Sequence, residues 1–90
     1  MILDLQQLLA GAARRAARAA FDIDLQDVSF QYPPRVELGD LALTAPFDLA
    51  KTLRRKPREI AERLAQKLAS AAGVRRAAVA GGGYVNLFVV

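Results

Sequence analysis

Apolar residues near the start of the chain recur at three- and four-residue steps, which predicts an amphipathic helix over residues 2–20. Alanine, the strongest helix former, occupies many of the remaining positions and supports this prediction. One face of the helix is therefore expected to pack against a core. The residues that share this face are Leu5, Leu8, Leu9, Ala12, Ala16 and Ala19.

A period of two replaces the helical spacing in the next part of the chain. Apolar and polar residues alternate over 28–32, which predicts a half-buried strand that ends before Pro33. Residues 35–43 are predicted to form a loop around Gly39 and Asp40, because Gly and Asp are typical turn residues.

Two proline residues mark the starts of two further helices. Proline suits the first helical turn, where its missing N–H has no partner to lose, so Pro46 and Pro57 predict helices over 46–53 and 57–72. The second helix repeats its apolar residues every four positions and so has one buried face. These residues are Ile60, Leu64 and Leu68.

The end of the chain predicts a β-hairpin. A Val- and Ala-rich strand over 74–80 leads through three glycines into a strand over 84–90. The second strand alternates strictly, so Val85, Leu87 and Val89 should face the core, and Tyr84, Asn86 and Phe88 should face the other way. The whole order of elements predicts an α+β fold, a small antiparallel sheet with helices packed on one face.

The length and composition narrow the functional classes. The 90 residues suffice for one domain, 1–90, and contain neither Cys nor His. These absences exclude a disulfide scaffold, a thiolate zinc site and a His-dependent hydrolytic triad, and we identify no catalytic residue and no metal ligand set. No apolar run reaches the length of a membrane span, and we expect a cytoplasmic protein. The chain stops at Val90 inside an apolar run, which suggests a fragment of a longer protein.

The positive charge lies in the second half of the chain. Residues 46–90 carry nine Lys or Arg against three acidic residues, whereas residues 1–45 carry four Arg against six acidic residues. A basic half suggests an anionic partner. Candidates for phosphate contact are Arg54, Arg55, Lys56, Arg75 and Arg76, with Lys51 one helical turn before the first three. A merely solvated basic surface is the alternative.

Tyr84 and Asn86 form the most informative pair in the sequence. An aromatic ring exposed on a sheet can stack on an unpaired nucleobase, and a neighbouring amide can donate to and accept from the edge of a base such as adenine. The alternative is that the second face of the sheet is also covered and that Tyr84 belongs to the core. The pattern alone leaves both open.

Three segments in register resemble one protein family. They read GDLALTAPFDLAK over 39–51, KPREIAERLA over 56–65 and VAGGGYVNLF over 79–88. Together they resemble the N-terminal additional domain of arginyl-tRNA synthetases, which shows the Gly39–Asp40 pair in a loop, a helix closed by Leu-Ala-Lys at Lys51, and a Gly-rich turn before an aromatic-x-Asn sequence. The resemblance extends over essentially residues 1–90.

The resemblance implies a function for the outer strand face. In such enzymes this domain contacts the D loop at the outer corner of tRNA-Arg, and the positions of Tyr84 and Asn86, together with Phe88, contact a base there. The full-length enzyme would use ATP and magnesium, whereas this chain lacks the catalytic and anticodon-binding parts and should bind no cofactor and catalyse nothing.

Two alternatives to this function remain open. The domain could dock on the remaining domains of the same polypeptide and orient them without touching RNA. It could also be a generic basic RNA-binding module, whose affinity would depend on salt and not on sequence.

Overall fold

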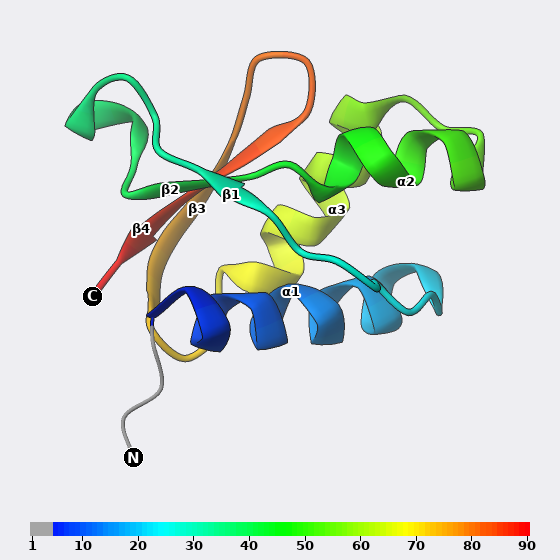
Figure 1. The fold of residues 1–90 in the computed structure, drawn as a ribbon, viewed down its shortest axis with the longest axis horizontal. Helices are drawn as coiled ribbons and strands as arrows, with labels where there is room; N and C mark the ends of the chain where they lie inside the picture. Colours follow the sequence, from blue (N-terminus) through cyan, green and yellow to red (C-terminus); the bar gives the residue numbers. More distant parts are fainter. Residues whose placement is uncertain (1–4) are drawn as a thin grey trace.

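The computed structural model describes residues 5–90 and confirms the α+β prediction (Figure 1). A four-stranded antiparallel sheet in the order β1-β2-β4-β3 packs against helices. Strand β4 is therefore central, and β3 forms one edge of the sheet. The elements are α1 (Leu5–Phe21), β1 (Phe30–Gln31), the 3-10 helix η1 (Val36–Leu38), β2 (Leu41–Leu43), α2 (Ala45–Leu53), α3 (Pro57–Leu68), β3 (Val74–Ala80) and β4 (Tyr84–Val89).

The prediction of a loop over 35–43 is wrong at its end, where the chain forms strand β2. This strand pairs with β1 on one side and with β4 on the other, and Leu41 and Leu43 lie opposite Leu87 and Val85. All three of its residues are buried. A central strand of three apolar residues has no alternation to detect, because both of its faces are covered.

Other elements are shorter than predicted. Residues 2–4 of the first helix lie outside the described residues, and the strand predicted over 28–32 contains only Phe30 and Gln31. Helix α3 ends at Leu68, the last residue of its buried face, and not at Ala72. The Ser70 hydroxyl donates to the carbonyl of Lys67, a local bond of the kind that competes with helical hydrogen bonding.

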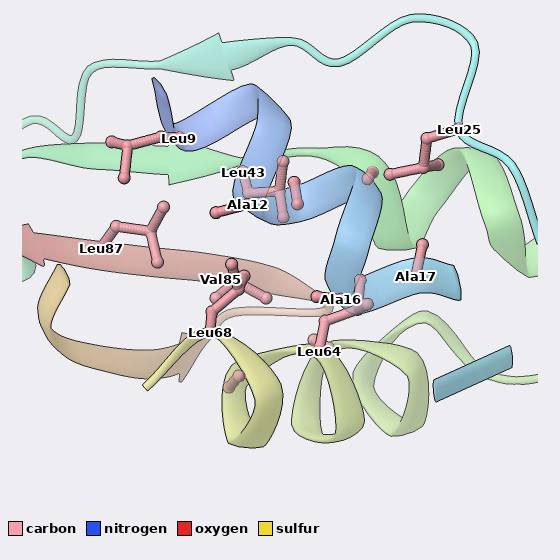
Figure 2. Packing of buried hydrophobic residues seen from close by; sticks show 14 of the residues in the cluster. Leu9, Ala12, Ala16, Ala17, Leu25, Leu43, Leu64, Leu68, Val85 and Leu87 are labelled. Atoms are coloured by element: carbon pink, nitrogen blue, oxygen red, sulfur yellow. The ribbon is translucent and has the colours of Figure 1, made fainter. Parts of the chain in front are cut away.

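The core lies between the sheet and helices α1 and α3 (Figure 2). Leu64 and Leu68 of α3 and Val85 and Leu87 of β4 are fully buried in it. Helix α1 contributes Leu9 and a series of buried alanines, whose small side chains permit close packing. Since burial fixes Val85 and Leu87 on the inner face, the alternate residues of β4 point away from α1 and α3.

Within residues 5–90, no helix combines the length and the apolar character that crossing a membrane requires.

Candidate functional site

The outer face of β4 carries the predicted residues in one row. Asn86 lies opposite Ala42 of β2 on one side and Ala78 of β3 on the other, and Tyr84 lies opposite Ala80. Alanine methyl groups do not reach over the neighbouring strand. The small neighbours therefore leave room above the side chain of Asn86.

A pocket of about 210 Å³ occupies this space, and we call it the outer-face pocket. The segment between β1 and β2 supplies one of its walls, and Tyr84 and Ala80 line another part. The sheet face is therefore a partly covered hollow and not an open surface, and Tyr84 is half-buried. The lining residues are Gln31, Tyr32, Pro33, Pro34, Leu38, Ala42, Ala80, Tyr84 and Asn86.

Asn86 is the one buried residue with a polar side chain within residues 5–90, with 6% of its surface exposed. No other described residue hydrogen-bonds its amide. No described side-chain polar atom is both fully buried and unpaired, so the amide must reach the surface, and it does so at the outer-face pocket. An amide that is mostly removed from water and has no internal partner is costly, and a ligand edge would supply the missing bonds.

The Gly39–Asp40 pair holds β4 in place. Gly39 has φ of 121°, and a Cβ at this position would lie 3.2 Å from the Leu87 carbonyl oxygen and 3.4 Å from the Asn86 Cβ. The Asp40 N–H donates to the Leu87 carbonyl at 2.8 Å, and the Val89 N–H donates to Asp40 Oδ2 at 2.9 Å. The pair thus fixes the strand on both sides of Asn86, a supporting role that the sequence alone did not reveal.

Phe47 and the α2–α3 junction position Tyr84. The Phe47 and Tyr84 rings meet edge to face, with centroids 4.9 Å apart and an interplanar angle of 68°. Arg58 Nη1 donates to the Gly81 carbonyl at 2.7 Å, which anchors the β3–β4 turn to the start of α3. The sequence indicated Phe47 only as an apolar residue of its helix, because its ring partner lies far away in the chain.

The predicted phosphate contacts fall into two groups. Arg54, Arg55 and Lys56, which we call the basic connector, join α2 to α3 and are exposed, as is Lys51 on α2. Arg54 ends α2 with a left-handed backbone conformation, φ 53°. The salt bridges among described residues involve Arg18 and Arg58 and none of these cations.

The second group lies on β3, at the opposite end of β4 from Tyr84. A β-bulge between Val74 and Arg76 inserts Arg75 as an extra residue. The guanidinium carbons of Arg75 and Arg76 lie 5.9 Å and 5.0 Å from the centroid of the Phe88 ring. The Phe88 ring is therefore already in contact with cations.

Among the described residues, no group of three or more His, Cys, Asp or Glu side chains is placed to hold a metal ion. The outer-face pocket has one amide and two phenol groups among its polar side chains, with Gln31 at its margin. This chemistry suits the binding of a planar, hydrogen-bonding ligand.

Comparison with known proteins gives one family. The model of the arginyl tRNA synthetase N terminal domain matches residues 3–89. The arginine–tRNA ligase of Xanthobacter autotrophicus is 47% identical over 68 residues, which cover 76% of this chain and 12% of that protein. The arginine–tRNA ligase of Paracoccus denitrificans is 37% identical over 90 residues, which cover 97% of this chain and 16% of that protein.

A solved structure agrees with these relatives. The arginyl-tRNA synthetase of Thermus thermophilus matches with a TM-score of 0.78 and 29% identity, over 97% of this chain and 14% of that chain. This chain thus spans only 12% to 16% of the length of these three relatives.

Proposed function

The chain belongs to the arginyl-tRNA synthetase N-terminal domain family, and from this membership we propose that it is the non-catalytic tRNA-binding part of an arginine–tRNA ligase. It contacts the D loop at the outer corner of tRNA-Arg and helps to select this tRNA for arginylation. ATP and magnesium would be bound by parts of the enzyme outside this chain. The remaining domains of the same polypeptide are its second partner, and the cytoplasm is its location.

The observation that carries the proposal is the amide of Asn86. It lies at the outer-face pocket beside an aromatic ring, is largely removed from water and has no hydrogen-bond partner among residues 5–90. An asparagine amide donates one hydrogen bond and accepts another, which matches the edge of adenine. Tyr84 supplies a ring on which the base can stack.

The surroundings of the pocket favour one unpaired nucleotide over a double helix. The pocket is a local hollow that is closed on one side by the segment between β1 and β2. Sequence-specific RNA recognition usually uses bases of loops that can leave their stack, and the D loop of a tRNA offers such bases. The cations at both ends of β4 would then contact the phosphates of the same loop.

The proposal is tested by fluorescence anisotropy with labelled tRNA-Arg at low salt. A second transcript carries uracil in place of the D-loop adenine. We expect the chain to prefer adenine by about 1–3 kcal/mol, a ratio of roughly 5 to 150 in dissociation constants. Asn86→Ala should bind both transcripts equally. Gln66→Ala removes an exposed amide on α3, away from the pocket, and should keep the preference.

The other outcomes identify the alternatives. Equal wild-type binding of both transcripts, with an affinity that follows salt alone, would mean a generic basic RNA-binding module. No binding of either transcript would mean a domain that docks on the remaining domains of its own polypeptide. Either result refutes base recognition by Asn86.

A further inference from the structure

The ring of Phe88 differs from the ring of Tyr84 in what surrounds it. Tyr84 lines the outer-face pocket, whereas Phe88 does not line it and lies beneath two guanidinium groups. Both arginines come from β3, and the extra residue at the bulge brings the second one to the same ring. A base that stacked on Phe88 would have to displace these cations.

We propose that Arg75, Arg76 and Phe88 form an anion clamp for a phosphodiester group of RNA, in which Phe88 is a positioning residue and not a stacking surface. This inference rests on the proposed function, since the phosphate belongs to the strand whose base enters the outer-face pocket. It assigns Phe88 a role different from the base contact expected from the sequence.

The ring contacts organise the two arginines for this task. A guanidinium group is planar, and a face that lies on an aromatic ring leaves the N–H edge free for phosphate oxygens. The same contact limits the rotation of a long side chain, so that less freedom is lost when the anion binds. Two guanidinium groups on one ring can donate to one phosphate together.

Local charge favours an anion at this place. None of the salt bridges among described residues involves Arg75 or Arg76. Asp40 bonds to the Val89 N–H from the β2 side of β4, whereas the arginines come from β3 on the opposite side. The two positive charges are thus left without a carboxylate partner within residues 5–90.

The spacing along β4 suits a neighbouring phosphate. Phe88 is two residues from Asn86 on the same face, a distance of about 7 Å at the usual rise of a strand. A phosphate flanking the nucleotide in the pocket can span this distance. The basic connector near Tyr84 lies toward the other end of the strand, so the RNA backbone would run along β4.

The test measures how binding of the adenine transcript falls with salt. Each lost phosphate contact on a single strand lowers the slope of log affinity against log salt by about 0.7. We expect Arg75→Ala with Arg76→Ala to lower the slope by that amount or more. The control pair Arg15→Ala and Lys67→Ala removes the same charge from α1 and α3 and should change the slope much less.

Phe88 variants separate positioning from stacking. Phe88→Leu should lower the slope while the preference for adenine over uracil stays unchanged, and Phe88→Tyr, which keeps the ring, should restore the wild-type slope. Loss of the adenine preference in Phe88→Leu with an unchanged slope would show a stacking role and overturn the clamp. An unchanged slope in the double arginine variant would also overturn it, even if Phe88→Leu failed to fold.

The clamp and the proposed function fail in different ways. If the wild-type chain binds no tRNA or shows no adenine preference, the proposed function fails and the clamp loses the strand it was assigned to. If the adenine preference is present and the arginine variants bind with a wild-type slope, only the clamp fails.

Discussion

Replacing Gly83 by alanine would insert a methyl group between the β3–β4 turn and the start of α3. An ideal Cβ at Gly83 would lie 2.6 Å from Pro57 Cβ and 3.0 Å from the Pro57 carbonyl carbon. Neither atom belongs to a flexible side chain, because one is in the proline ring system and the other is backbone. The turn and the helix must therefore move apart.

The expected cost follows from two terms. Overpacking of a filled site costs about 1–3 kcal/mol. A φ of 156°, which side chains rarely adopt, adds strain of about 1–3 kcal/mol. We expect the free energy of unfolding to fall by about 3 kcal/mol, out of the roughly 5–13 kcal/mol typical of 90 residues. This loss corresponds to a melting temperature lower by about 12–24 °C.

Thermal unfolding followed by circular dichroism measures the effect, and the adjacent glycine provides the control. A Cβ at Gly82 would meet only Phe47 Cε1 at 3.8 Å, an ordinary contact. Gly82→Ala should therefore change stability by no more than about 1 kcal/mol, in either direction. Equal melting temperatures for Gly83→Ala and Gly82→Ala would refute the argument that the turn is closely packed against Pro57.

Three further predictions concern the supports of the site. Asn86→Ala should change the free energy of unfolding by less than about 1 kcal/mol in thermal melts, because the amide loses no internal hydrogen bond; a loss above about 2 kcal/mol would mean that the amide stabilises the fold. Asp40→Ala should cost about 1–2 kcal/mol in urea unfolding and speed hydrogen exchange at the Val89 amide, whereas the exposed Asp27→Ala should do neither. Arg54→Gly should raise stability by about 1 kcal/mol, since glycine adopts the left-handed conformation freely, and should weaken tRNA binding at low salt; a less stable variant in urea unfolding would contradict the first part.

The sequence predicted the elements that have a local signal. The alternation over 84–90 identified the two faces of β4, and the structure places Val85 and Leu87 in the core and Tyr84 and Asn86 on the other face. The glycines predicted the turn, and Pro57 marked the start of α3 where it is found. These features depend on neighbouring residues, which the sequence shows directly.

Strand β2 and the outer-face pocket had no such signal. The three residues of β2 form a strand only because β1 and β4 pair with them, and those partners lie far away along the chain. The wall formed by Tyr32 and Leu38 likewise depends on where the segment between β1 and β2 is placed over the sheet. Short apolar segments and loops take their structure from such distant contacts.

The sequence by itself therefore determined the α+β class, the two faces of β4 and the family resemblance, because periodicity, turn residues and motifs are local properties. Only the tertiary structure decided that Asn86 is buried without a partner at a pocket and that Phe88 lies beneath Arg75 and Arg76. Burial and cation–ring contacts arise when strands separated in sequence are brought side by side by the pairing of the sheet.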